Sequence, residues 1–131
     1  MAFWFALVWI ATASADEAEV RIYTIRSIPI SAPPEATIVH LDDAGAIEEE
    51  LSAGLSHDPA RAVTTARQRL TDGGAELQRD LVAAYEVIAE AWSLGITTLP
   101  AVVVDRRYVI YGEADISRAI ARIETFRRTQ P

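Results

Sequence analysis

The stretch that most constrains the fold is residues 97–112, TTLPAVVVDRRYVIYG, in which a proline precedes two apolar runs. Proline has no N–H to donate to a sheet, so it is found at a strand's first residue, on an edge or at a bulge. Pro100 stands at the entrance of the first run. The polar residues between the two runs predict an antiparallel hairpin that turns near residues 105–107. Arg106 is a poor choice there if the turn requires a positive φ.

Two further apolar stretches lie upstream of this hairpin. EVRIYTI at residues 19–25 alternates and predicts a strand with both faces largely covered. The next stretch, RSIPISAPPEA, carries three of the six prolines and is expected to be a loop or an extended arm. TIVHL at residues 37–41 is a nearly continuous apolar run, which favours an interior strand of a parallel sheet.

Three helices are expected between residues 42 and 95. The first follows Asp42 and Asp43 and carries apolar residues at four-residue steps (Ile47, Leu51 and Leu55). The second begins at Asp58 and Pro59 and ends at TDGG, residues 71–74. The third spans about residues 75–94, is ended by Gly95, and has a predicted buried stripe of Leu77, Leu81, Tyr85, Ile88 and Trp92. A closing helix is expected from about residue 113 to 128.

The composition excludes several classes of chemistry. The 131-residue chain has no cysteine, which removes disulfides, thiolate metal sites and thiol redox catalysis. The formal net charge of −7 opposes direct contact with nucleic acid. The two histidines, His40 and His57, have no third ligand at a zinc-binding spacing. We therefore expect no metal and no cofactor.

The first fifteen residues, MAFWFALVWIATASA, are uncharged and end in a small-x-small pattern before the acidic DEAE. This is typical of a secretory signal peptide cleaved after Ala15, although a basic n-region is missing. The expected organisation is a signal peptide at 1–15 and a single domain at 16–131, with no membrane span after cleavage. A retained anchor or a buried N-terminal segment are the alternatives.

The order of the elements resembles the thioredoxin-like fold, in which a hairpin entered through a cis-proline is followed by a final helix. Four segments of the chain, in order, carry a second resemblance: VRIYTIRSIPIS, ELSAGLSHDPARAVTTARQRL, AYEVIAEAWSLGITTLPAVVVD and RYVIYGEADISRAIARI. On these segments the chain after residue 15 resembles a family of exported thioredoxin-like proteins of integrating conjugative elements, which has no assigned activity.

The resemblance implies an α/β, thioredoxin-like fold. Its central mixed sheet would have about four strands, helices on both faces and a helical insertion before the cis-proline hairpin. It also implies a cis Leu99–Pro100 bond and a periplasmic accessory role in conjugative DNA transfer beside a type IV secretion system. The expected partner is a protein of that conjugation apparatus.

The chain departs from the redox members of this fold where they carry Cys-x-x-Cys, because the equivalent region here reads RSIPIS. We therefore expect a non-catalytic protein that binds a partner in a shallow groove. The expected groove residues are Ser27, Ile28, Pro29, Thr98, Leu99 and Pro100. One alternative is an enzyme that uses Ser27 with a bound small thiol such as glutathione. Another is a periplasmic chaperone for pilus components, and the simplest is that Pro100 only opens a buried strand.

Overall fold

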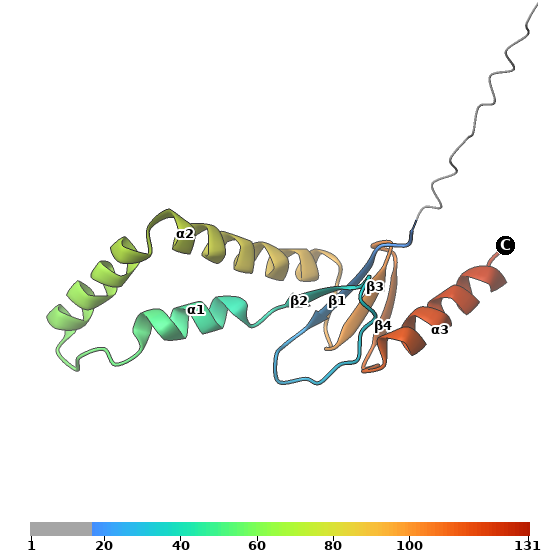
Figure 1. The fold of residues 1–131 in the computed structure, drawn as a ribbon, viewed down its shortest axis with the longest axis horizontal. Helices are drawn as coiled ribbons and strands as arrows, with labels where there is room; N and C mark the ends of the chain where they lie inside the picture. Colours follow the sequence, from blue (N-terminus) through green and yellow to red (C-terminus); the bar gives the residue numbers. More distant parts are fainter. Residues whose placement is uncertain (1–16) are drawn as a thin grey trace, which may run out of the picture.

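The computed structural model describes residues 17–131, so the expected signal peptide and its cleavage site lie outside the described residues. Within these residues, two strands are followed by two helices, a second pair of strands and a final helix (Figure 1). In order they are β1 (Val20–Thr24), β2 (Thr37–His40), α1 (Asp43–Ser52), α2 (Pro59–Ser93), β3 (Ala101–Val104), β4 (Tyr108–Tyr111) and α3 (Ile116–Thr129).

The strands form one mixed sheet in the order β2-β1-β3-β4. β1 pairs with β2 in parallel and with β3 in antiparallel register, and β3 pairs with β4 as the expected hairpin. The two central strands are almost completely buried, in keeping with their apolar sequences VRIYT and AVVV. The chain is therefore an α/β protein with a four-stranded mixed sheet.

The prediction that β2 lies inside the sheet is wrong. β2 is an edge strand, and Ile38 on it is 43% exposed. β1 pairs with β3 on one side and with β2 on the other. No further strand of the described residues pairs with the outer side of β2, so β2 forms the edge of the sheet. A short apolar run is compatible with either position, because it does not record how many strands flank it.

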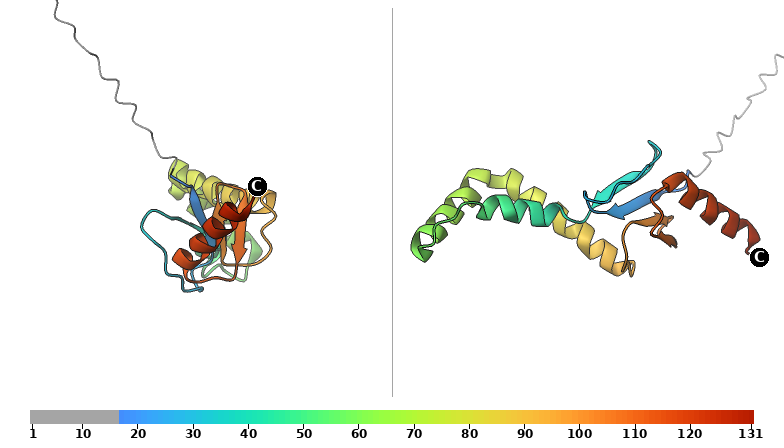
Figure 2. Two further views of the ribbon diagram at one scale, coloured as in Figure 1. Left: turned by 90° about the vertical axis from the view of Figure 1, so that its right-hand side faces the viewer. Right: turned by 90° about the horizontal axis from the view of Figure 1, so that it is seen from below.

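Helices cover both faces of the sheet, as expected (Figure 2). On one face α3 packs Ile116, Ala119 and Ile123 against side chains of β1 and β3. On the other face only the last turns of α2 reach the sheet, through Ala91 and the partly buried Val87. The packed body thus consists of the sheet, α3 and the end of α2.

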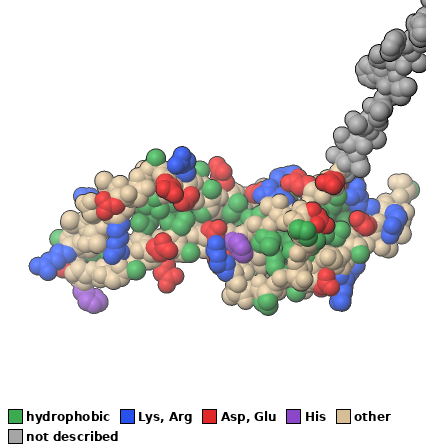
Figure 3. Space-filling model, viewed as in Figure 1, with side chains coloured by type: hydrophobic (Ala, Val, Ile, Leu, Met, Phe, Trp, Pro, Cys, Tyr) green, Lys and Arg blue, Asp and Glu red, His purple; other side chains and the backbone are tan. Residues whose placement is uncertain are grey.

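The rest of α2 runs away from the sheet together with α1 and forms a projecting helical arm, defined here as residues 43–83 (Figure 1). Apolar side chains gather along the seam between the two helices (Figure 3). The Arg69 side chain crosses this seam and donates to the carbonyls of Leu51 and Ala53, at 3.0 and 2.7 Å. These bonds satisfy carbonyl groups left unpaired at the end of α1.

The start and the internal break of α2 follow from local chemistry. The Asp58 carboxylate accepts a hydrogen bond from the Ala60 N–H at 3.1 Å, and Pro59 occupies the first turn. At Gly74 the backbone leaves helical geometry, with φ 56° and ψ −148°. The predicted stop at residues 71–74 is therefore a break, after which the chain resumes as a helix at once.

The predicted buried stripe of the third helix is wrong in part. Tyr85 is 50% exposed and Trp92 is 81% exposed, whereas Ala84 and Ala91 are buried. The helical period is correct, but the face turned to the sheet is the one that carries small alanines. This occurs because α2 touches the sheet only at its end, where small side chains allow the backbone to approach closely.

Two residues of the hairpin turn have positive φ angles, 52° at Asp105 and 53° at Arg106. Arginine is an unfavourable residue for such a turn. The Asp105 carboxylate offsets this by accepting bonds from the Glu19 N–H and from the Arg127 side chain, both at 3.0 Å. The turn is thereby tied to the start of β1 and to the end of α3. The backbone conformation at Arg106 is held by this tertiary context rather than by its own preference.

Candidate functional site

The Leu99–Pro100 peptide bond is cis, as expected. Pro100 is buried immediately before β3, and its carbonyl accepts a hydrogen bond from the Gly112 N–H at 2.9 Å. The register that pairs Tyr23 with Ala101 places this corner beside the end of β1. The proline therefore marks the edge of the sheet where β1 ends and β3 begins.

The two residues before Pro100 leave their backbone free. Within residues 17–131, neither the N–H nor the C=O of Thr98 and Leu99 makes a backbone hydrogen bond. Thr98 is exposed, while the Leu99 side chain is half-buried and packs toward the α2 face of the sheet. This short segment can pair with an extended peptide without breaking any existing backbone bond.

An apolar hollow of about 280 Å³ lies directly beside this segment. It is lined by Leu41, Ile88, Ala91, Trp92, Ile96, Thr97 and Leu99. Trp92 is the most exposed large apolar side chain described, at 81%, and stands over this hollow. The sequence interpretation missed Trp92 as a site residue because its helical spacing is the same whether it is buried or exposed.

The predicted loop residues lie at the same end of the sheet but face another direction. Ser27 and Pro29 are exposed, and the half-buried Ile28 donates its N–H to the Ile25 carbonyl at 3.1 Å. The loop then runs toward the α3 face, where Ser31 exchanges backbone bonds with the start of α3. Within the described chain, no hydrogen bond joins residues 27–29 to residues 98–100.

Charged groups brace this end of the sheet. The Arg26 N–H donates to the Asp42 carboxylate at 3.1 Å, and the Arg26 guanidinium pairs with Asp42 and Asp43. These contacts tie the end of β1 to the start of α1. Both carboxylates are paired with this arginine, which fixes the loop after β1 against the start of α1.

A second charged cluster lies on the α2 face. The Glu90 carboxylate pairs with Arg21 at 2.8 Å and also with Arg106, and its side chain is only 17% exposed. The Tyr23 hydroxyl is buried nearby and has no hydrogen-bond partner among the described residues. Burial raises the pKa of Tyr23 to about 12, so the hydroxyl is neutral and is not a base at physiological pH. The cluster clamps α2 to β1 and to the hairpin turn.

The described residues hold no group of three or more His, Cys, Asp or Glu side chains placed to bind a metal ion. His40 is half-buried on β2, whereas His57 is exposed in the loop before α2. None of the helices in residues 17–131 combines the length and the apolar character needed to cross a bilayer.

The fold defines an α/β protein with a four-stranded mixed sheet, whose corner at Pro100 has unpaired backbone groups. Residues 17–129 match the family described as "Protein of unknown function (DUF1525)", and the chain belongs to this family. No curated protein and no solved structure matches the chain.

Proposed function

We propose that this chain is a non-catalytic, thioredoxin-like accessory protein of conjugative DNA transfer. It is exported to the periplasm, where it binds a protein partner of the type IV secretion apparatus. The proposal is supported by the resemblance of the four quoted segments to exported proteins of integrating conjugative elements. The absence of cysteine supports the non-catalytic part, because a fold of this type performs redox chemistry through thiolates.

The observation that carries the proposal is the unpaired backbone of Thr98 and Leu99 beside an apolar hollow. An extended partner segment adds to this backbone as a short strand and inserts an apolar side chain under Trp92. Main-chain hydrogen bonds give affinity in this mode of recognition, and the side-chain pocket gives selectivity. Tryptophan is also among the residues most often found to dominate binding energy at interfaces.

A chaperone for pilus components is the second candidate, and the observation that favours it is exposed apolar surface along α2. Val82, Tyr85 and Trp92 are 58%, 50% and 81% exposed. A chaperone would use this surface to hold several unrelated clients, whereas the leading proposal requires one specific partner. Suppression of aggregation of unrelated proteins would therefore favour the chaperone.

The test compares Trp92→Asp with Val82→Asp, a matched control on the same helix whose side chain is also exposed. Both variants should fold like the wild type by circular dichroism. In cells that carry the conjugative element, the wild type and Val82→Asp should crosslink to one protein encoded by the element. Trp92→Asp should weaken this capture by about tenfold or more, as expected for a dominant interface residue.

Transfer frequency provides the functional measurement. A strain that lacks the gene should regain conjugation with the wild type and with Val82→Asp, but not with Trp92→Asp. Equal capture and equal transfer by both variants would contradict a partner site at this hollow. Transfer that does not depend on the gene would contradict the role in conjugation itself.

A further inference from the structure

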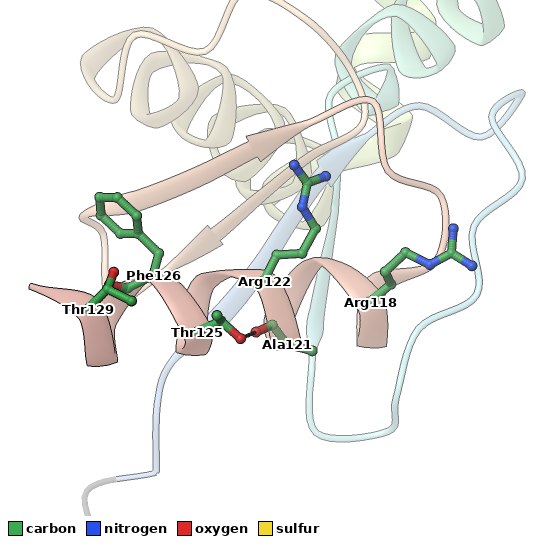
Figure 4. A pocket seen from close by; sticks show the side chains of 6 residues that line it. All are labelled: Arg118, Ala121, Arg122, Thr125, Phe126 and Thr129. Carbon is green, nitrogen blue, oxygen red and sulfur yellow. Dashed lines mark hydrogen bonds between the residues drawn. The ribbon is translucent and has the colours of Figure 1, made fainter.

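A second hollow lies on the opposite face of the sheet from Trp92, between the edge strand β4 and α3. It has a volume of about 420 Å³, and its walls include Arg107, Tyr108, Ile110, Arg122, Ile123 and Phe126. Arg122 and Phe126 project from the same side of α3, whereas Ala121 and Thr125 lie on the other side (Figure 4). Its lining is mixed, because the aromatic and aliphatic side chains give apolar surface and the two arginines give a charged rim.

The free edge of β4 runs along this hollow. Because Gly112 donates its N–H to Pro100, the alternation of an antiparallel ladder turns the backbone of Ile110 toward β3. Val109 and Tyr111 therefore direct their N–H and C=O groups to the open side. The strand reads YVIY and carries no proline, lysine or inward-pointing charge of the kind that protects sheet edges.

The charge at the rim is uncompensated. Arg106 and Arg127, on the same elements, are paired with Glu90 and Asp105. Within the described part of the chain, Arg107 and Arg122 have no carboxylate within salt-bridge distance, and both are exposed. In a chain with a net charge of −7, two free guanidiniums beside an apolar hollow form a local site of opposite sign.

We propose that the groove between β4 and α3 binds an extended acidic peptide segment, which adds to β4 as a fifth strand. One apolar side chain of the peptide enters the hollow. Carboxylates two residues before and two residues after it lie on the same face of the added strand and pair with Arg107 and Arg122. Strand addition between a sheet edge and a helix is a recurring mode of peptide recognition. Charge complementarity at the rim selects acidic segments. This site is separate from the corner at Pro100 and does not depend on it.

The aromatic residues favour a peptide over a nucleic acid as the occupant. The guanidiniums of Arg107 and Arg127 already lie over the Tyr108 ring, at 5.5 and 5.4 Å from its centroid. The ring also meets Phe126 edge-on at 6.3 Å. Single-stranded nucleic acids bind by stacking bases on open aromatic faces, and stacking here would displace these contacts. The net negative charge of the chain adds to this preference.

The test uses a fluorescein-labelled heptapeptide with a central Phe, Glu two residues before and after it, and Thr at the remaining positions. The peptide is titrated with the purified chain and followed by fluorescence anisotropy. Arg107→Glu/Arg122→Glu should weaken binding by about tenfold or more, through loss of two charge pairs and new repulsion. The matched control is Arg67→Glu/Arg79→Glu, which makes the same charge change at exposed α2 positions and should bind like the wild type. A peptide with Gln in place of Glu should bind about tenfold more weakly.

Amide hydrogen exchange measured by NMR tests the strand addition. Bound peptide should slow exchange at Val109 and Tyr111, whose N–H groups face the open edge. The proposal is overturned if the heptapeptide shows no binding at millimolar concentration, or if binding leaves these two amides unchanged. It is also overturned if oligothymidine binds more tightly than the peptide. A dimer in light scattering that the Arg107→Glu/Arg122→Glu variant abolishes would show instead that this face joins two copies of the chain.

Discussion

Tyr23 is a core residue whose hydroxyl is buried at a cost in free energy. It is the largest fully buried side chain of the described residues, yet its hydroxyl has no hydrogen-bond partner there. A buried polar group without a partner loses its bonds to water and gains nothing in return. The neighbouring Glu90 carboxylate is already engaged by Arg21 and Arg106. The ring therefore stabilises the fold through its apolar area, while burial and, to a smaller extent, the nearby Glu90 carboxylate raise the pKa of the hydroxyl.

Tyr23→Phe is accordingly expected to keep or slightly raise the free energy of unfolding at neutral pH, by up to about 1 kcal/mol. The two proteins should differ more in alkaline solution. The pKa of Tyr23 rises from 10.0 to about 12 on folding, so the unfolded chain ionises first. Below pH 10 the hydroxyl is protonated in both the folded and the unfolded chain, and the wild type loses stability as the pH rises from 10 toward 12.

Urea denaturation at pH 8 and pH 11 measures both effects. The wild type should lose more stability than Tyr23→Phe between these two values, and the difference isolates Tyr23 from the other tyrosines. A variant that is clearly less stable at pH 8 would show that the hydroxyl has a partner. An equal loss at pH 11 would contradict the raised pKa.

Residues whose roles are local could be predicted from the sequence. Asp58, Pro59 and Pro100 act through hydrogen bonds and torsions within a few residues of themselves, and the structure has them in the predicted roles. Tyr85 and Trp92 could not be placed, because their burial depends on how α2 meets the sheet. The hollow under Trp92 was missed for the same reason.

At the scale of the element, α2 is defined by its break. Gly74 adopts φ 56° and ψ −148°, a backbone conformation that is essentially reserved for glycine. A Cβ at Gly74 would meet no atom within 4 Å, so the constraint is torsional and not steric crowding. The break bends the arm, and it sets where residues 59–72 lie over α1.

Gly74→Ala should lower the free energy of unfolding by about 1–3 kcal/mol or else straighten α2. The control is Gly45→Ala in α1, where the backbone is helical and the space around a Cβ is open. This control should raise stability by up to about 1 kcal/mol, because alanine favours helix over glycine. Thermal denaturation gives the stabilities, and spin-label distances between residues 61 and 86 report straightening.

Equal and favourable effects of the two substitutions would show that residue 74 is helical in solution. This contrast is informative because both changes add the same methyl group where the space around a Cβ is open. Only the backbone torsion differs between the two sites.

The strands show which properties of an element can be predicted from the sequence. The apolar runs of β1, β3 and β4 and the turn between the last two were predicted close to their observed bounds. The edge position of β2 was not, because the number of neighbours of a strand is decided by the whole sheet. The positive φ at Arg106 was also unfavourable by local preference, and it is maintained by the bonds of Asp105.

At the scale of the molecule, the resemblance implied the α/β class, the mixed sheet and the helices on both faces, and the structure has these features. The resemblance did not imply that α1 and the first part of α2 project away from the sheet. Apolar residues at helical spacing predict a buried stripe, but Val63 and Leu70 are 49% and 46% exposed. Two helices that pack mainly on each other show the same periodicity as two helices packed on a sheet.

The division of the molecule into a projecting arm and a packed body predicts a large difference in local stability between these two parts. Nearly all buried side chains belong to the sheet, α3 and the end of α2, whereas Ala44 is the only buried one described in residues 43–83. Segments with few buried apolar contacts open at lower free energy than the core. Amide hydrogen exchange followed by mass spectrometry should therefore show fast exchange in residues 43–72 and slow exchange in β1 and β3.

Arg69→Ala tests whether the arm opens independently of the body. Arg69 joins α2 to the last carbonyls of α1, and loss of hydrogen bonds from a charged donor should speed exchange in the arm by about tenfold. Arg79→Ala, which removes an exposed arginine without a described ion pair, is the control and should change little. Exchange in β1 and β3 should be the same in all three proteins, because their amides are protected by sheet pairing that Arg69 does not touch. If Arg69→Ala instead speeds exchange equally in the arm and in the central strands, the two parts unfold as one cooperative unit.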